Sequence, residues 1–236
     1  MKKSGILFLI PTVISENTSE KVLPSYLISI INGLDEFIVE DERSARRFLK
    51  AAGYLKPLDS ITLHQLNKHT DITELPAFLN SLIHGKNIGL LSEAGCPCVA
   101  DPGSAIVKLA HEHQILVKPL VGPSSILLAL MASGLNGQNF VFHGYLPIEK
   151  NARIKKIKEL ENKSNRENQT QIFMEAPFRN MQLLNDILHS CNSNTSLCIA
   201  SDITGSNEFI QTKSISEWKN KIPELNKKTV IFLLYK

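Results

Sequence analysis

The stretch of sequence that decides the fold runs over residues 88–103 and reads IGLLSEAGCPCVADPG. Its first four residues form a continuous apolar run, which is typical of a strand buried on both faces of a parallel sheet. The loop that follows is long and contains Glu93, Gly95, Asp101 and Gly103. Ligands collect at the carboxyl ends of strands in open α/β sheets, so this loop is a candidate functional site. The alternative is an ordinary turn formed by glycine and proline.

Apolar runs alternate with amphipathic segments on both sides of this stretch. Strands are predicted at 6–10, 37–39, 88–91 and 115–121, and helices at 20–31, 43–52, 75–83 and 105–113. This alternation predicts an α/β fold with a parallel or mixed sheet. Pro119, Gly122 and Pro123 then mark a boundary between an N-terminal α/β domain, residues 1–119, and a C-terminal α/β domain, residues 122–236.

The second half restarts with a predicted helix at 125–133, capped by Ser124 and stopped by Gly134. Further strands are predicted at 140–143, 171–174, 197–200, 209–212 and 230–234, with helices at 152–160, 181–188 and 216–221. The free backbone N–H groups at the start of the 125–133 helix can bind a carboxylate or another anion, assisted by the hydroxyls of Ser124 and Ser125. A routine helix cap is the alternative.

The overall composition excludes several classes of protein. Lys and Arg number 26 against 23 Asp and Glu, a net charge of only +3, which argues against a histone-like polycation. The 4 cysteines are too few for a disulfide framework at this length, which predicts a cytoplasmic protein. No His or Cys pair at zinc-ligand spacing accompanies Cys96 and Cys98, so no metal is expected. No apolar stretch approaches about 20 residues, so no membrane span is expected.

The excess positive charge is concentrated in residues 149–166, which carry a net +4 while the rest of the chain carries −1. Ile154, Ile157 and Leu160 recur every three residues, which predicts a helix with one buried stripe and lysines on the other side. Lys155 and Lys156 are therefore candidates for contact with a polyanion, because phosphate neutralisation is the main source of nucleic-acid affinity. A solvated charged face is the alternative.

Five short motifs together resemble the tetrapyrrole methylase superfamily, and most of all its ribosomal RNA small subunit methyltransferase I family. That family carries Asp-Ala-Gly-Thr-Pro, Ser-Asp-Pro-Gly, Pro-Gly-Pro-Ser-Ala, Gly-Phe-Leu-Pro and Tyr-Glu-Ala-Pro-His-Arg. The counterparts here, in the same order and with similar spacing, are residues 93–97, 100–103, 121–125, 144–147 and 174–179. Residues 40–43, EDER, stand where the family has Glu-Asp-Thr-Arg.

The resemblance implies two α/β domains with S-adenosylmethionine in the cleft between them, a homodimer, and methylation of a cytidine ribose 2′-OH in ribosomal RNA. Ribosomal RNA or the 30S subunit is then the expected partner. The implied cofactor-binding residues are Pro11, Glu93, Ala94, Gly95, Cys96 and Val99, with Ser124 and Ser125 on the other wall of the pocket.

The resemblance also suggests residues that act on the substrate. Asp101 and Glu175 are candidates for the general base, because the matching family positions face the cleft. A structural hydrogen-bonding role is the alternative for Glu175. Arg43 and Arg179, with the two lysines at 155 and 156, are the expected RNA contacts, although both arginines can also pair with nearby carboxylates.

The chain departs from the family at several points. Its first loop, residues 9–15, reads LIPTVIS and lacks the family's glycine, so a β-branched residue stands near a position that favours positive φ. The family's Arg-Glu-Leu-Thr-Lys is here SDITG at 201–205, its histidine is Phe178, and the chain ends directly after the last predicted strand, without the C-terminal extension of many members. Three hypotheses therefore stand: an RNA ribose methyltransferase, a methyltransferase of a small molecule such as a tetrapyrrole, and a cofactor-binding protein without catalysis.

Overall fold

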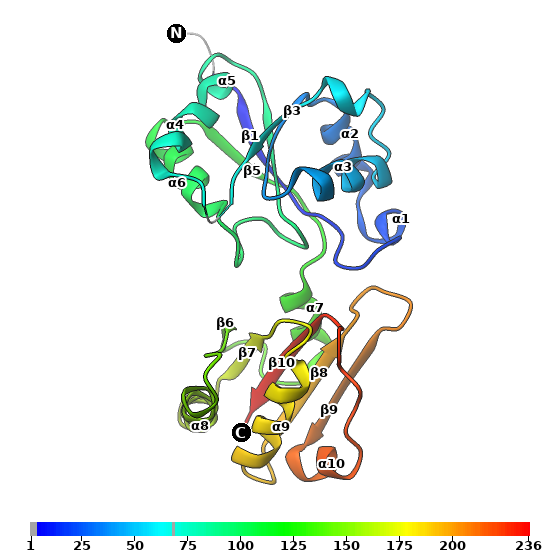
Figure 1. Ribbon diagram of the computed structural model, residues 1–236, viewed down its shortest axis with the longest axis vertical. Helices are drawn as coiled ribbons and strands as arrows, with labels where there is room; N and C mark the ends of the chain where they lie inside the picture. Colours follow the sequence, from blue (N-terminus) through cyan, green and yellow to red (C-terminus); the bar gives the residue numbers. More distant parts are fainter. Residues whose placement is uncertain (1–3, 68) are drawn as a thin grey trace. The chain divides into compact units, whose positions relative to one another are not determined.

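The computed structural model describes residues 4–67 and 69–236. The chain divides into two compact units, Met1–Ser124 and Ser125–Lys236, which we call unit 1 and unit 2 (Figure 1). In the described part of the chain each unit contains one five-stranded sheet with helices packed against it. The predicted α/β class is therefore confirmed.

The sheet of unit 1 is entirely parallel, and its strand order is β3-β2-β4-β1-β5. Its strands are β1 (Ile6–Ile10), β2 (Glu36–Val39), β3 (Thr62–Gln65), β4 (Ile88–Leu91) and β5 (Leu116–Pro119). Its helices are α1 (Ser19–Val22), α2 (Ser25–Asn32), α3 (Glu42–Ala51), η1 (Leu58–Ser60), η2 (Ile72–Glu74), α4 (Leu75–Phe78), α5 (Asn80–Ile83) and α6 (Ser104–Glu112). Because all the strands are parallel, the loops that follow them lie along one edge of the sheet.

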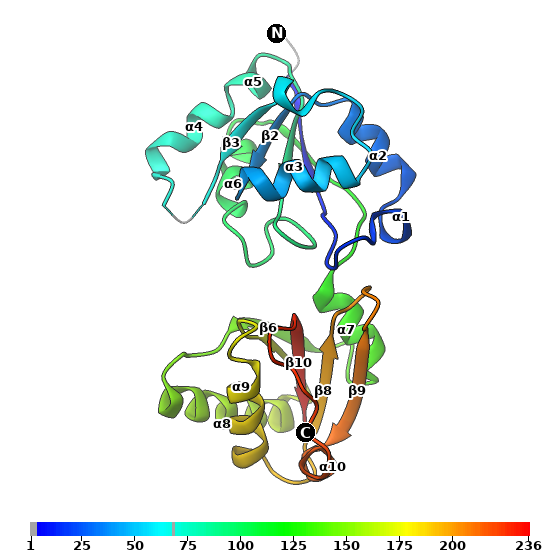
Figure 2. The same ribbon diagram turned by 45° about the vertical axis from the view of Figure 1, so that its right-hand side comes forward.

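Helices cover both faces of this sheet, as the continuous apolar runs of β1 and β4 require. One core packs α2 and α3 against alternate residues of β1, Phe8 and Ile10. The second core packs α4, α5 and α6 against the intervening residue Leu7 and against Leu90. Figure 2 shows α3 crossing in front of the sheet. Alternate β1 side chains thus serve opposite cores, which is the period of two expected for a buried strand.

Three features of unit 1 differ from the sequence prediction. β3 was not predicted, because it is an edge strand whose side chains are half-buried or exposed and partly polar. The single helix predicted over 20–31 is interrupted between α1 and α2, where Pro24 lacks an N–H and disfavours helical backbone at Leu23. The predicted 75–83 helix is likewise two short helices, which meet at Leu79.

The sheet of unit 2 is mixed, with strand order β6-β7-β10-β8-β9; only the β6–β7 pair is parallel among the described strands. Its strands are β6 (Phe140–Tyr145), β7 (Thr170–Met174), β8 (Ser196–Ser201), β9 (Phe209–Ser214) and β10 (Val230–Tyr235). Its helices are α7 (Ser125–Ser133), α8 (Lys150–Glu167), α9 (Asn180–Ser190) and α10 (Ile215–Asn220).

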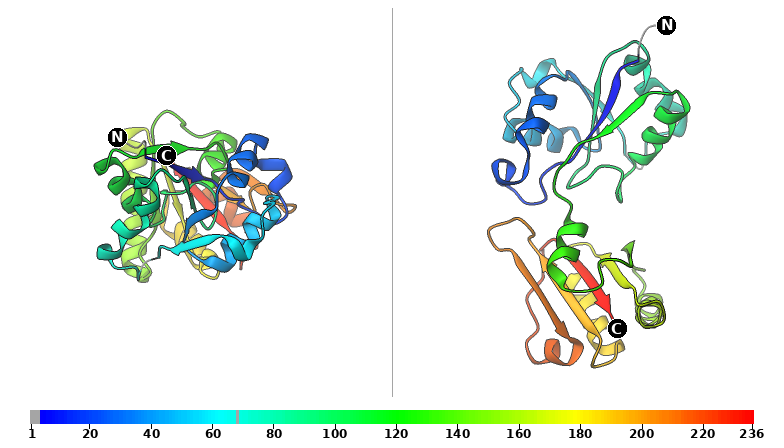
Figure 3. Two further views of the ribbon diagram at one scale, coloured as in Figure 1. Left: turned by 90° about the horizontal axis from the view of Figure 1, so that it is seen from above. Right: turned by 180° about the vertical axis from the view of Figure 1, so that it is seen from behind.

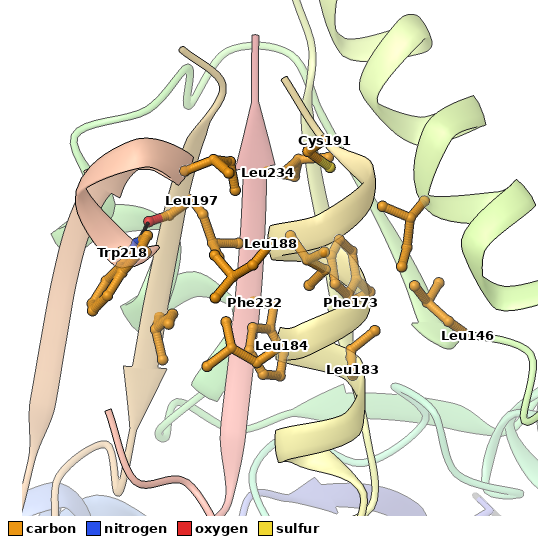
Figure 4. Packing of buried hydrophobic residues seen from close by; sticks show 14 of the residues in the cluster. Leu146, Phe173, Leu183, Leu184, Leu188, Cys191, Leu197, Trp218, Phe232 and Leu234 are labelled. Atoms are coloured by element: carbon orange, nitrogen blue, oxygen red, sulfur yellow. Dashed lines mark hydrogen bonds between the residues drawn. The ribbon is translucent and has the colours of Figure 1, made fainter. Parts of the chain in front are cut away.

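Two cores also hold unit 2 together. Figure 4 shows the larger one, in which the α9 leucines pack onto Phe173 of β7 and Phe232 of β10. Trp218 of α10 is buried there and donates its Nε1–H to the Leu197 carbonyl at 2.8 Å. On the opposite face α7 packs through Ala129 against the same sheet (Figure 3). The sheet is therefore covered on both sides.

α8 is longer than the predicted helix at 152–160. Glu149 caps its N-terminus by accepting hydrogen bonds from Asn151 N and Ala152 N at 2.9 and 2.7 Å, and Asn168 ends it in a left-handed conformation with φ 50°. In the part of the chain that the structure describes, no helix combines the length and the apolar character needed to cross a membrane.

Candidate functional site

The carboxyl edge of the unit 1 sheet brings together most of the residues predicted to bind the cofactor. Pro11 follows β1, residues 93–99 follow β4, and Ser124 ends the segment after β5. β1 lies between β4 and β5, so these three loops are neighbours. Sequence motifs far apart along the chain are thus adjacent in the fold because their strands are adjacent.

The first two loops are joined by a short antiparallel bridge. Thr12 N donates to the Gly95 carbonyl at 2.9 Å, and Gly95 N donates to the Thr12 carbonyl at 3.2 Å. The Ser92 hydroxyl adds a further bond to the Gly95 carbonyl at 2.6 Å. Gly95 has φ +76°, a conformation that a residue with a side chain adopts only under strain. The glycine therefore fixes the path of the β4 loop over β1.

The segment after β5 passes close over both loops. A Cβ added to Gly122 would lie 2.4 Å from Cβ of Pro11, so only glycine allows this approach. The Cys96 thiol donates to the Pro123 carbonyl at 3.5 Å. Burial raises the pKa of Cys96, and a hydrogen bond with Ser124 partly offsets that effect. Pro11, Gly95, Cys96 and Ser124 therefore form one connected surface of backbone and small side chains.

This surface fits a ligand recognised through backbone groups. In the described residues the N–H groups of Ala94 and Cys96 have no hydrogen-bond acceptor within the chain. Ala94 and Glu93 are exposed, and Cys96 is half-buried. Val99, in the same loop, is 47% exposed. Two free donors beside small side chains can hold the polar edge of a cofactor, while the Glu93 carboxylate can accept from ligand hydroxyls.

The second half of the β4 loop is organised by Asp101. Its carboxylate accepts from Cys98 N at 2.9 Å and from Gly103 N at 2.8 Å. Cys98 and Ala100 have φ +68° and +63°, so two non-glycine residues of this loop lie in the left-handed region. Such strain persists only where surrounding bonds impose it. The contacts of Asp101 in the structure are thus those of a loop-fixing residue, and its role as a general base stays a prediction.

The structure places Asp101 close to two other carboxylates at this edge. Burial raises the pKa of Glu40, and the negative charges of Glu93 and Asp101 raise it further. Arg43 is exposed on the first turn of α3, where Asp41 caps the helix by accepting from Ser44 N at 2.8 Å. Burial, followed by the charge of Asp101, raises the pKa of the Cys98 thiol to about 11, so this thiol is neutral at physiological pH.

A groove of about 420 Å³ lies beside these residues within unit 1. Its walls are the first loop, one face of α3 and the Glu93–Ala94 segment, and they carry Ser15, Glu16, Asn17, Ser44 and Arg47 among others. None of the β-branched residues Thr12, Val13 and Ile14 in this loop has a positive φ, and the left-handed residue that follows the loop is Asn17, φ 58°.

Arg47 was not among the predicted site residues, although it lines this groove. The sequence does contain a signal for it. Arg47 lies four residues after Arg43 on the α3 helix, and residues with that spacing share one helix face. The two arginines therefore present positive charge from the same side of α3.

In unit 2 Arg179, predicted from the sequence to be an RNA contact or the partner of a nearby carboxylate, is paired with Glu175. Glu175 Oε1 accepts from Ala176 N at 2.7 Å and from Arg179 Nε and Nη2 at 3.0 and 2.6 Å. The other carboxylate oxygen, Oε2, is buried and has no hydrogen-bond partner among the described residues. The hydrogen bonds that Arg179 donates to Glu175 raise the pKa of Arg179. The pair positions the guanidinium, and the proposed base function of Glu175 stays a prediction.

One basic residue of helix α8 is not on the charged surface that the sequence predicted. Arg153 is buried, donates from Nε to Asp186 Oδ2 at 2.7 Å and does not belong to the charged surface. Its Nη1 also donates to the Ile148 carbonyl at 2.6 Å. Lys155 is exposed and makes no ion pair with the described residues, whereas Lys156 is partly buried and pairs with Glu159 at 2.7 Å. The two lysines are therefore not equivalent as polyanion contacts.

The remaining predicted residue, Ser125, is the first residue of α7. Across residues 4–67 and 69–236, no group of three His, Cys, Asp or Glu side chains is arranged to hold a metal ion.

Comparison with solved structures identifies the fold. The methyltransferase CobJ aligns with a TM-score of 0.64 and 14% identity, covering 100% of this chain and 95% of that one. The uroporphyrin III C-methyltransferase of Thermus thermophilus aligns with a TM-score of 0.57 and 14% identity, covering 98% of each chain. At such low identities the likeness shows the fold alone, which is the tetrapyrrole methylase fold.

Comparison with curated sequences identifies the family. The ribosomal RNA small subunit methyltransferase I of Vibrio cholerae is 30% identical over 212 residues, 90% of this chain and 69% of that protein. The protein of the same name from Streptococcus pyogenes serotype M6 is 31% identical over 216 residues, 92% of this chain and 71% of that protein. No protein-family model matches the chain. Sequence identity, coverage and fold agree, and the chain is a methyltransferase that belongs to the ribosomal RNA small subunit methyltransferase I family.

Proposed function

We propose that the chain uses S-adenosylmethionine to methylate a ribose 2′-hydroxyl of ribosomal RNA. The observation that carries this proposal is the 30% identity to the Vibrio cholerae enzyme over 90% of the chain. The motif resemblance is part of the same sequence similarity, and the tetrapyrrole methylase fold agrees with it. The same resemblance supports a cytoplasmic homodimer with the 30S subunit as its partner.

The cofactor is proposed to lie on the carboxyl edge of the unit 1 sheet. Pro11, residues 93–96, Val99 and Ser124 supply backbone donors and small side chains there, and Ser125 begins unit 2. The bound cofactor supplies a methyl group activated by a positively charged sulfur. The chain's own residues then orient the ribose hydroxyl in line with that methyl group and remove its proton.

RNA as the substrate agrees with the cations that the structure leaves exposed. Arg47 lines the groove of unit 1, Arg43 is exposed one turn earlier on α3, and Lys155 is exposed on α8 of unit 2. Phosphate neutralisation by such groups gives salt-dependent affinity. The tetrapyrrole alternative is not favoured, because the tetrapyrrole enzymes resemble this chain in fold only, at 14% identity or below.

The third hypothesis, a cofactor-binding protein without catalysis, loses one of its supports. It relied partly on the missing glycine of the first loop. No residue of that loop, 9–15, has a positive φ, so neither Val13 nor Ile14 is forced into the left-handed region. The loop therefore has an unstrained path at its β-branched residues.

Mass spectrometry of small-subunit ribosomal RNA tests the proposal. RNA from cells that lack the gene should miss one ribose methyl group, and purified protein with S-adenosylmethionine should restore it in vitro. A Gly95→Val variant should fail to restore it, because valine strains the φ +76° backbone that shapes the cofactor surface. Circular dichroism of this variant checks that it is folded. Identical methylation in both strains would contradict the RNA assignment, and calorimetry with S-adenosylmethionine would then decide whether cofactor binding survives.

A further inference from the structure

Two large aromatic rings are exposed at the carboxyl ends of the parallel strands β6 and β7. Tyr145 ends β6 and is 59% exposed, and Phe178 lies in the loop after β7 and is 68% exposed. A phenylalanine has no polar group that benefits from water, so a ring exposed to this extent suggests a contact surface. Both residues belong to unit 2, and neither is needed to fill its cores.

The backbone is shaped to present Tyr145. Gly144 has φ +66°, and the pairing of β6 with β7 shifts register between Phe142 and Tyr145. After the shift Tyr145 lies opposite Met174, the last residue of β7. Irregularities of this kind re-aim side chains and are frequent next to functional sites. The bulge thus sets Tyr145 at the same end of the sheet as the loop that carries Phe178.

A fixed cation completes this surface. The Arg179 guanidinium lies 4.9 Å from the centroid of the Phe178 ring, within the range of a cation–π interaction. Its Nε and Nη2 both donate to buried Glu175 Oε1, which fixes the guanidinium plane. The hydrogen bond to Glu175 is the main cause that raises the pKa of Arg179, and the charge of ionised Tyr145 adds to it. The surface therefore combines two π faces with a planar positive charge, and the carboxylate of Glu175 that holds the arginine is buried.

Nucleobases match this chemistry. Unpaired bases stack on aromatic rings and on arginine planes, and RNA recognition commonly relies on such stacking. Positive charge for the adjoining phosphates is supplied by α8, which begins at Lys150, shortly after Tyr145 in the chain. We propose that Tyr145, Phe178 and Arg179 form a stacking platform for an unpaired nucleobase of the RNA substrate. This inference rests on the proposed RNA methyltransferase function and names how unit 2 holds its substrate.

The test measures binding of a fluorescein-labelled single-stranded oligoribonucleotide by fluorescence anisotropy, alongside the same strand with abasic sites in place of its bases. Phe178→Leu keeps the apolar bulk but removes the π face. We expect it to weaken binding of the normal strand about 5- to 100-fold, as the loss of one base stack predicts. Binding of the abasic strand and the salt dependence should not change, because the phosphate contacts are intact. Phe178→Trp keeps an aromatic ring and should bind the normal strand about as tightly as the wild type does.

Tyr26 provides a matched control. It is 53% exposed and has Lys118 5.4 Å from its ring centroid, but it belongs to unit 1. Tyr26→Leu should leave the binding of both strands unchanged. Equal binding of the normal strand by wild type and Phe178→Leu would overturn the platform, as would equal weakening of both strands.

An assay of methyl transfer to small-subunit RNA distinguishes a failure of the stacking platform from a failure of the proposed methyltransferase function, on which the platform rests. A wild-type protein that methylates the RNA, with an unchanged KM for RNA in Phe178→Leu, overturns the platform and leaves the function standing. A wild-type protein that binds S-adenosylmethionine but neither methylates nor binds RNA overturns the proposed function, and the platform with it. A raised KM with little change in kcat supports the platform, because stacking acts on binding rather than on the methyl transfer step.

Discussion

Replacement of Gly122 by alanine tests how the cofactor surface of unit 1 is held together. A Cβ at this position would lie 2.4 Å from Cβ and 2.8 Å from Cγ of Pro11. Both distances are shorter than real carbon atoms tolerate, and the proline ring cannot rotate away. Either the segment after β5 or the first loop must therefore move. This movement separates Pro11 from Gly122.

The expected cost follows from the size of this clash. Overpacking of a well-packed site costs about 1–3 kcal/mol, and the loss of glycine flexibility in the unfolded chain returns about 0.4–1 kcal/mol. With the middle of each range, the net destabilisation of Gly122→Ala is about 1.3 kcal/mol. For a domain the size of unit 1 this lowers the melting temperature by about 4–8 °C. Affinity for S-adenosylmethionine should fall as well, because Pro11 is displaced.

Two other glycines provide controls that separate the possible causes. Gly53 has φ +77° and open space around its Cβ position, so Gly53→Ala should show backbone strain of about 1 kcal/mol without a clash. Gly137 has neither a positive φ nor a neighbour within 4 Å, so Gly137→Ala should be nearly neutral. Differential scanning calorimetry and titration with S-adenosylmethionine compare the three variants. If Gly122→Ala has the same melting temperature and the same affinity for S-adenosylmethionine as Gly137→Ala, the close packing of the segment after β5 on Pro11 is refuted.

Three further predictions concern charged and ionisable groups. Arg153→Leu leaves Asp186 buried without its partner and should destabilise unit 2 by about 3–5 kcal/mol in chemical denaturation. Replacing both residues by leucine should recover most of that loss, and no recovery would refute the buried pair. Burial raises the pKa of the Cys98 thiol from 9.0 to about 11, so the unfolded thiol ionises first as pH rises. The free energy of unfolding should therefore fall between about pH 9 and 11, by more in the wild type than in Cys98→Ser; parallel curves would contradict this. Glu175→Gln should raise KM for RNA by loosening Arg179 while kcat at saturating RNA changes less than tenfold. A fall of 100-fold or more, with an altered pH profile, would instead place Glu175 in proton transfer.

The sequence predicted the buried elements well, and the reason is physical. β1 and β4 are apolar throughout because helices cover both faces of their sheet. β3 lies at the edge of that sheet, mixes polar with apolar residues, and so resembles a loop in the sequence. The break at Pro24 could have been predicted from the proline alone, but the amphipathic pattern over 20–31 continued across it. At this point the proline disfavours a helix while the spacing of apolar residues favours one. The structure shows that the helix is interrupted at the proline.

The sequence could predict which loops form the candidate site, because the sheet topology brings those loops together. Once the strands are parallel, the loops after β1, β4 and β5 must lie at one edge. The bonds between those loops were not predictable, because Thr12 and Gly95 bridge through backbone groups that every residue carries. The same limit applies to Arg153: its sequence neighbours are exposed lysines, and only the fold shows that Asp186 of α9 lies against it.

The two units also differ in what their sites require of the sequence. The cofactor surface of unit 1 depends on backbone conformation. Gly95 provides a positive φ, and Gly122 allows the close approach of the segment after β5 to Pro11. Side chains there can change, as Cys96 in place of the family's threonine illustrates. The exposed surface of unit 2 depends instead on side-chain chemistry, through Phe178 and Arg179. Substitutions of Phe178 and Arg179 should therefore alter the choice and affinity of the RNA while S-adenosylmethionine binding persists, because the glycines that shape the cofactor loops lie in unit 1.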